Sequence, residues 1–286
     1  MVDTATPDIV TALNWARGRI ALADARLLLR RVLRCDAAHL VAYSESALDA
    51  EQWHAFQRVV ERREAGEPVA YLVGEREFYG YSLVVTPAVL IPRHETELLV
   101  ELALAKFGDR PRARVLDLGT GSGALAVALA RELPDADVTA VDRSREALLI
   151  AMANAARLKA SVSFVLSNWF SALAGDRFQL IVANPPYVAA GDAHLVEGDV
   201  RFEPLSALAS GPEGLDDISY IVARSPHHLE SNGWLFVEHG HDQALRVRSL
   251  MADAGFAEIA SWRDLAGIER VTGGQWRGMG GHGTAA

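Results

Sequence analysis

The sequence predicts an α/β protein, in which a small helical bundle and a β-hairpin precede a mostly parallel sheet with helices on both faces. Two observations carry this prediction. After residue 111, short apolar runs alternate with helical segments, a pattern typical of parallel strands joined by helical crossovers. The preceding residues show a different periodicity, helical at first and then strand-like. We expect a helical domain at residues 1–75, a hairpin linker at 76–92 and a sheet domain at 93–286.

The helical domain is predicted from side-chain spacing and from helix-end signals. Asp49 followed by Gln52 resembles a capping box, and Gly66 followed by Pro68 ends the helix that begins there. Together with the other apolar positions, these signals fit a bundle of roughly three to five helices. Apolar side chains recur at helical spacing at Leu22, Ala25, Leu28, Leu29, Val32 and Leu33.

The pattern becomes strand-like over residues 78–91, where Gly80 is a turn signal and Thr86-Pro87 a break. We interpret this stretch as a hairpin between the two domains. A helix over residues 95–107 should follow and end at Gly108.

The sheet domain is predicted element by element. The last two strands have only a short turn between them, so we expect an antiparallel pair at the carboxyl end. Strands are expected at 114–118, 137–142, 162–166, 178–183, 234–237, 257–262 and 269–272, and helices at 124–131, 146–158 and 244–254.

Composition limits the possible classes of function. Hydrophobic residues make up 50% of the chain and the formal net charge is −9, so we expect a sizeable core and no direct nucleic-acid partner. Cys35 is the only cysteine, which excludes an intrachain disulfide and favours a reducing, cytoplasmic location. No apolar run approaches the roughly 18 residues of a membrane span, and the first residues do not resemble a signal peptide. We expect a monomer without membrane association.

A glycine-rich segment lies between the first predicted strand of the sheet and the helix after it. Its residues are Asp117, Leu118, Gly119, Thr120, Gly121, Ser122 and Gly123. Glycines let a ligand approach the backbone, and the helix begins with free N–H groups. Asp142, 23 residues after Gly119, ends the next strand and could accept hydrogen bonds from ribose hydroxyls. These features alone fit either a nicotinamide dinucleotide or S-adenosylmethionine.

The tetrapeptide Asn184-Pro185-Pro186-Tyr187 follows an apolar run at the predicted carboxyl end of a strand, where open α/β sheets bind ligands. Proline has no N–H, so the carbonyls of Asn184 and Pro185 have few donors nearby. The Asn184 side chain adds another oxygen, and Tyr187 an aromatic wall. Such an acceptor-rich pocket suits a planar NH2 group and favours methyl transfer to nitrogen over hydride transfer. A plain loop that ends the sheet is the structural alternative.

Together, the glycine-rich segment, Asp142 and the tetrapeptide resemble the class I S-adenosylmethionine-dependent methyltransferases, which have a Rossmann-like sheet and act on planar NH2 nitrogens. Further segments are similar to the release factor glutamine methyltransferases, and this likeness covers nearly the whole chain. These segments are Leu90-Ile91-Pro92-Arg93, Thr96-Glu97, Glu203-Pro204, Ala207-Leu208, Gly214-Leu215-Asp216, Glu238-His239-Gly240, Asp264-Leu265-Ala266-Gly267 and Arg270-Val271.

The resemblance implies methyl transfer from S-adenosylmethionine to the side-chain amide nitrogen of the glutamine in the Gly-Gly-Gln motif of peptide chain release factors, in translation termination. By the same resemblance, Asp117 and the segment Gly119 to Gly123 line the methionine moiety and Asp142 the ribose. Trp169 packs by the adenine, and Asn184, Pro185, Pro186 and Tyr187 hold the substrate amide. From the residues themselves we expect catalysis by positioning, with no side-chain base, so the rate should vary little between about pH 6.5 and 9. The sequence departs from the family pattern at His94, Asn168 and Ser210.

Three other functions remain as alternatives: an adenine-N6 nucleic-acid methyltransferase, an NAD-dependent oxidoreductase and a non-catalytic adaptor. The pairs His227-His228 and His239-His241 suggest no metal site, because no further ligand set is visible. Gly273-Gly274-Gln275 spells the substrate motif itself, and we expect it after the last strand, in a glycine-rich tail where its occurrence is coincidental.

Overall fold

The computed structural model describes residues 6–108, 110 and 112–278. The chain divides into two compact units. One unit combines the chain up to Glu75 with Gly198–Phe202, and the other contains Arg76–Glu197 and the chain from Glu203 onward. Among the described residues, no helix is both long and apolar enough to cross a membrane.

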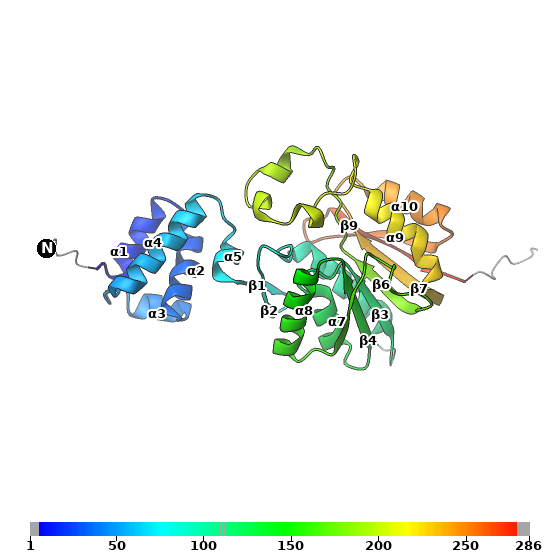
Figure 1. The fold of residues 1–286 in the computed structure, drawn as a ribbon, viewed down its shortest axis with the longest axis horizontal. Coiled ribbons are helices and arrows are strands. Elements are labelled where there is room, and N and C mark those ends of the chain that lie inside the picture. The colour runs from blue at the N-terminus through cyan, green and yellow to red at the C-terminus, as the bar shows by residue number, and fades with distance from the viewer. Residues whose placement is uncertain (1–5, 109, 111, 279–286) are drawn as a thin grey trace, which may run out of the picture. The chain divides into compact units, whose positions relative to one another are not determined.

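The first unit is a helical bundle, as the sequence predicts (Figure 1). Its buried core includes Leu28, Leu29, Phe56 and Val60. The predicted capping box is present, because Asp49 Oδ1 accepts a hydrogen bond from the Gln52 amide at 2.7 Å and the Gln52 side chain accepts one from the Asp49 amide at 3.0 Å. The helices are α1 (Ile9–Arg17), α2 (Leu22–Leu33), α3 (Ala37–Ala42), α4 (Ala50–Glu64) and α5 (Val69–Val73).

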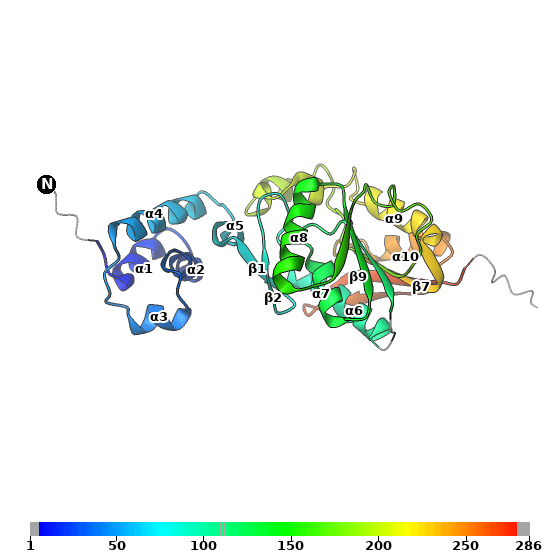
Figure 2. The same ribbon diagram turned by 60° about the horizontal axis from the view of Figure 1, so that its bottom comes forward.

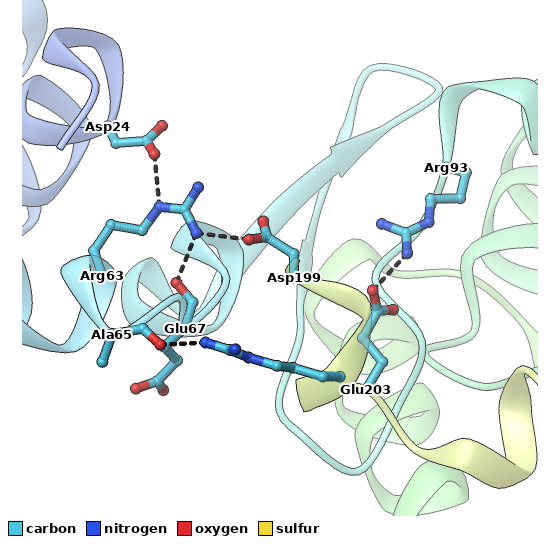
Figure 3. Close-up of polar contacts among 8 residues, drawn as sticks. Asp24, Arg63, Ala65, Glu67, Arg93, Asp199 and Glu203 are labelled. Carbon is cyan, nitrogen blue, oxygen red and sulfur yellow. Dashed lines mark hydrogen bonds and ion pairs between the residues drawn. The ribbon is translucent and has the colours of Figure 1, made fainter. Parts of the chain in front are cut away.

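Gly198–Phe202 joins this helical unit although the sequence places it far from the bundle (Figure 3). The Arg63 guanidinium binds Asp24 and Asp199, with both N–O distances at 2.7 Å. Arg201 donates a further hydrogen bond to the Ala65 carbonyl. Nothing in the sequence pattern indicated this attachment.

The second unit is built on a seven-stranded sheet, whose order over the described residues is β5-β4-β3-β6-β7-β9-β8. The five strands from β5 to β7 are parallel, whereas β9 runs antiparallel to both of its neighbours. This confirms the predicted parallel sheet with an antiparallel pair at the carboxyl end. The strands are β3 (Arg114–Leu118), β4 (Asp137–Asp142), β5 (Val162–Leu166), β6 (Phe178–Ala183), β7 (Leu229–Glu238), β8 (Ala257–Arg263) and β9 (Glu269–Trp276).

Helices cover both faces of the sheet, which explains why its central strands, such as β6, are mostly apolar (Figures 1 and 2). Val115, Val182 and Phe236 belong to the core shared with α6, α7 and α8. Their chain neighbours, such as Leu116 and Ile181, belong to the core shared with α9 and α10. The helices are α6 (Glu97–Phe107), α7 (Ala124–Glu132), α8 (Arg145–Leu158), α9 (Asp216–Arg224) and α10 (Ala244–Asp253).

A hairpin is present but lies earlier than the expected residues 78–91, because its strands are β1 (Glu75–Phe78) and β2 (Tyr81–Val84). The buried amide of Asn154 on α8 ties this hairpin to the glycine-rich segment. Its oxygen accepts from the Val84 amide at 2.7 Å, and its nitrogen donates to the carbonyls of Val84 and Ser122 at 3.0 and 2.9 Å. The hairpin thus supports the ligand-binding edge of the sheet.

Two strands are longer than predicted, and α9 was not predicted. β7 begins at Leu229, and β9 continues through Gly273-Gly274-Gln275 to Trp276. The expectation that this Gly-Gly-Gln follows the last strand is therefore wrong. Its glycines lie in the sheet interior, where a Cβ on Gly273 would come within 2.2 Å of the Phe236 ring, so packing explains them.

Candidate active site

A cavity of about 250 Å³ opens at the carboxyl ends of the parallel strands, beside β3 and β4. The strand order reverses at β3, which pairs with β4 on one side and β6 on the other, and ligands bind at such a switch point. Its lining includes Gly119, Gly121, Asp142, Trp169 and Pro186, all of which the sequence singled out.

The glycine-rich segment forms the turn between β3 and α7. Gly119, Gly121 and Gly123 have φ angles of +75°, +54° and +84°, which side chains with a Cβ rarely adopt. The Gly123 amide donates to the Thr120 carbonyl at 2.8 Å, and α7 begins at the next residue. The buried side chain of Ser122 completes the turn.

Asp117 lies under this turn with 1% of its surface exposed. Its Oδ2 accepts hydrogen bonds from the Thr120 hydroxyl at 2.6 Å and from the Ala126 amide at 3.2 Å, while no described residue donates to Oδ1. Burial raises the pKa of Asp117 to about 7. A buried carboxylate oxygen without a partner suits a donor such as an ammonium or hydroxyl group, and S-adenosylmethionine carries both.

Asp142 ends β4 and faces the cavity. Its two oxygens accept from the amides of Gly121 at 2.9 Å and Ser144 at 2.8 Å. Each carboxylate oxygen can accept a further hydrogen bond, so ribose hydroxyls could be held here. The acceptors that Asp142 offers to the cavity therefore fit the nucleoside part of the expected cofactor.

The Trp169 indole lies beside Gly119, where an added Cβ would come within 3.1 Å of the ring. Its Nε1 donates to Asp217 Oδ1 at 3.0 Å. Ser210 completes this arrangement, because its hydroxyl donates to Asp217 Oδ2 at 2.7 Å and accepts from the Asp217 amide at 2.8 Å. The departure from the family pattern at Ser210 therefore supports the tryptophan through Asp217, a residue that the sequence reasoning missed.

The other two residues that depart from the family pattern, Asn168 and His94, are both exposed. Asn168 is exposed and lines the cavity next to Trp169. His94 is also exposed, and its Nδ1 lies 3.0 Å from Glu97 Oε1.

The Asn-Pro-Pro-Tyr tetrapeptide follows β6 at the same edge of the sheet. Asn184 Nδ2 donates to Thr96 Oγ1 at 2.9 Å, while no described residue donates to Asn184 Oδ1. Pro185 and Pro186 are buried, and the Tyr187 hydroxyl donates to Glu238 Oε1 at 3.3 Å. Burial raises the pKa of Tyr187, so its hydroxyl keeps its proton and remains a donor.

Glu238 is the functional candidate that sequence reasoning left without a role. It ends β7 with 1% of its surface exposed, and burial raises its pKa to about 7. Its Oε2 has no hydrogen-bond partner among the described residues. An acidic residue directly after the apolar run Trp234 to Val237 was the available signal, because charged side chains are rarely buried without a purpose.

Two of the histidines named from the sequence, His228 and His239, pack within the fold. His239 is buried, with Nδ1 2.9 Å from the Gly240 carbonyl and Nε2 2.8 Å from Thr272 Oγ1, and burial lowers its pKa. His228 stacks on Phe170 with ring centroids 4.5 Å apart. Within the part of the chain that the structure describes, no three His, Cys, Asp or Glu side chains gather as a metal site.

Two segments that carried the sequence resemblance meet beside the cavity. Glu203 is buried, and its carboxylate binds the Arg93 guanidinium and accepts from the Ile91 amide at 3.0 Å (Figure 3). The residues next to each partner, Leu90 and Pro204, line the cavity. This ion pair therefore joins the segment after the hairpin to the loop after the tetrapeptide.

Comparison with known proteins agrees with this geometry. A family model described as a methyltransferase small domain matches residues 94–199, and one described as a PrmC N-terminal domain matches residues 11–74. A 16S rRNA methyltransferase of T. thermophilus, solved with AdoMet and guanosine, shares the fold with a TM-score of 0.54 and 24% identity, over 71% of this chain and 50% of that chain.

Curated relatives match over nearly the whole length. The release factor glutamine methyltransferase of Xylella fastidiosa is 47% identical over 274 residues, which cover 96% of this chain and all of that protein. The enzyme of the same name from Pseudomonas aeruginosa is 51% identical over 257 residues, covering 90% of this chain and 93% of that protein. The chain therefore belongs to the release factor glutamine methyltransferase family, whose members are S-adenosylmethionine-dependent enzymes.

Proposed function

We propose that this protein transfers a methyl group from S-adenosylmethionine to the side-chain amide nitrogen of the glutamine in the Gly-Gly-Gln motif of peptide chain release factors. The observation that carries the proposal is the acceptor-only character of the tetrapeptide after β6. Asn184 donates its NH2 group to Thr96, so its Oδ1 remains available, and two prolines follow that have no N–H. A substrate NH2 group offers the two donors that this pocket lacks.

We assign the following roles to the site residues. Asn184 Oδ1 and the Pro185 carbonyl accept the two N–H bonds of the substrate amide, and Tyr187 packs beside it with Pro186. Asp142 binds the ribose, Trp169 packs against the adenine, and Asp117 with residues 119–123 holds the methionine moiety. The cofactor supplies an electrophilic sulfonium methyl when it is bound. The nitrogen becomes positive during transfer, and the two oxygens stabilise this charge while they hold the nitrogen in line.

We propose that residues 1–75 bind the release factor, through a bundle that carries no catalytic constellation. The acidic net charge of −9 supports a protein partner over direct contact with nucleic acid. A role in translation termination supports a cytoplasmic location, and we propose that the protein acts as a monomer.

Substitution of Asn184 tests the function. Asn184→Ala should lower kcat on the order of 10²-fold because it removes a stabilising acceptor, while calorimetry should show S-adenosylmethionine binding within a few-fold of wild type. Asn168→Ala, which alters an exposed asparagine in the cavity lining, is the matched control and should retain kcat.

The assay should include parallel incubations with a release factor, DNA and NAD, and mass spectrometry should locate any methyl group. Methylation of the Gly-Gly-Gln glutamine supports the proposal. Methylated adenine, or full turnover by Asn184→Ala, would contradict it.

A further inference from the structure

Polar side chains contact both Asn184 and Tyr187 of the tetrapeptide. Asn184 Nδ2 donates to Thr96 Oγ1 at 2.9 Å, and the Tyr187 hydroxyl donates to Glu238 Oε1 at 3.3 Å. The Thr96 hydroxyl is also near enough to the Glu238 carboxylate to lower its pKa. A single buried carboxylate thus accepts from Tyr187 and lies next to the hydrogen-bond partner of Asn184.

The numbers of donors and acceptors on these side chains determine which group donates in each hydrogen bond. An ionised carboxylate only accepts hydrogen bonds, and a threonine hydroxyl has one proton to donate. When Thr96 donates that proton to Glu238, its oxygen can only accept from Asn184. The Asn184 amide must then direct its NH2 group at Thr96 and leave Oδ1 for the substrate. The same carboxylate accepts the Tyr187 proton and so fixes the orientation of that hydroxyl.

Stability does not explain Glu238. Its side chain is buried, and Oε2 has no partner among the described residues. A buried carboxylate with an unsatisfied oxygen destabilises a fold, whereas an apolar side chain at the end of β7 would stabilise it. The position is thus better explained by an effect on the neighbouring tetrapeptide.

We propose that Glu238 is a positioning residue that, through Thr96 and Tyr187, orients the Asn184 amide so that the pocket accepts only hydrogen-bond donors. This inference rests on the proposed function, because it deepens the role of Asn184 in holding the substrate NH2 group. A protonated Glu238 can donate to Thr96, which then can donate to Asn184 and turn its amide. The pocket would then present NH2 to the substrate NH2, and turnover would fail.

Charged groups around Glu238 determine the pH at which its carboxylate becomes protonated. Its pKa is raised to about 7, chiefly by burial; Glu95 before α6 also raises the pKa, whereas the Thr96 and Tyr187 hydroxyls and Arg270 on β9 lower it. Arg270 is itself paired with Asp264, and Arg93 acts on Tyr187. Turnover should therefore fall as the pH drops through about 7, in contrast to the flat profile expected from sequence.

The test is a set of variants assayed for methylation of a release factor between about pH 6 and 9. Thr96→Val removes the connecting hydroxyl and should lower kcat about two- to tenfold, the worth of one hydrogen bond, while Thr96→Ser retains the hydroxyl and the rate. Glu238→Gln should lower kcat at least as much and abolish the acid limb. The double variant Thr96→Val with Glu238→Gln should lower kcat no more than the worse single variant does, because both substitutions interrupt the same series of hydrogen bonds.

Glu95→Gln is the matched control, since it removes a neighbouring carboxylate without altering Glu238, Thr96, Tyr187 or Asn184. It should shift the acid limb to lower pH and leave the plateau rate unchanged. Equal rates for Thr96→Val and Thr96→Ser, or an acid limb that persists in Glu238→Gln, would overturn the proposal. Calorimetry with S-adenosylmethionine and thermal unfolding show whether each variant is folded. If the wild-type protein fails to methylate the release factor, the proposed function fails instead, whatever the variants do.

Discussion

Two glycines of the turn after β3 should differ in what an added methyl group disturbs. Gly121 lines the cavity, and an alanine Cβ there would meet nothing within 4 Å. At Gly123 the same Cβ would lie 3.0 Å from Ala151 Cβ and 3.1 Å from its Cα, on the buried face of α8. Gly121→Ala should therefore impair ligand binding, and Gly123→Ala the packing of the fold.

The magnitudes follow from these distances. Both residues have positive φ angles, so alanine at either costs about 1–2 kcal/mol of backbone strain. Gly123→Ala adds overpacking against Ala151, which costs about 1–3 kcal/mol, for a total of about 2–5 kcal/mol. In a domain of this size each kcal/mol lowers Tm by about 2–4 °C. Gly121→Ala should lower the stability only by the cost of the backbone strain. Its methyl group would enter the cavity and weaken S-adenosylmethionine binding more than about tenfold, or 1.4 kcal/mol.

Thermal unfolding and calorimetry with S-adenosylmethionine check both effects. Gly175→Ala is the control, because Gly175 is exposed at φ +86° with nothing within 4 Å of its Cβ and lies outside the cavity lining. It should lose about as much stability as Gly121→Ala and bind the cofactor normally. The reasoning is refuted if Gly121→Ala and Gly123→Ala lose equal stability, or if Gly121→Ala binds S-adenosylmethionine with an unchanged Kd.

Three further substitutions probe the cofactor site. Asp142→Ala should weaken S-adenosylmethionine binding by about 1.5–3 kcal/mol, the worth of a charged hydrogen bond, and an unaltered Kd by calorimetry would refute the ribose assignment. Ser210→Ala removes both hydrogen bonds to Asp217 and should lower the free energy of unfolding in urea by about 1–3 kcal/mol, with weaker cofactor binding because Trp169 loses its fixed partner; wild-type values for both would show that Ser210 supports nothing. Asp117 has its pKa raised from 3.8 to about 7, so the folded state binds its proton more tightly than the unfolded state. Its contribution to stability is present in full below pH 3.8 and is lost as the pH rises to about 7, by up to about 1.4 kcal/mol per pH unit. Asp117→Asn should lack this component, and parallel stability curves for variant and wild type would contradict the buried assignment.

The sequence predicted the parallel strands accurately, for a physical reason. The bounds of β3, β4, β5 and β6 match the expectation because helices cover both faces of the sheet, so each strand is a short apolar run between polar turns. β7 and β9 were predicted too short, since Gly233, Gly273 and Gly274 resemble breaks in a strand. Close packing, such as that of Gly273 against Phe236, requires these glycines inside the sheet.

The candidate site divides in the same way. Some parts of the site are local sequence patterns, so their chemistry can be predicted from the sequence. These are the Asn-Pro-Pro-Tyr tetrapeptide, the glycine-rich segment and Asp142. By itself, the sequence determined the α/β class and the family resemblance, and it predicted an acceptor-rich pocket at the tetrapeptide. It could not show that Asn184 donates to Thr96, 88 residues away, or that Tyr187 donates to Glu238, 51 residues away. Only the tertiary structure decided those pairings, because hydrogen bonds between distant segments exist only after the sheet has brought the ends of its strands together.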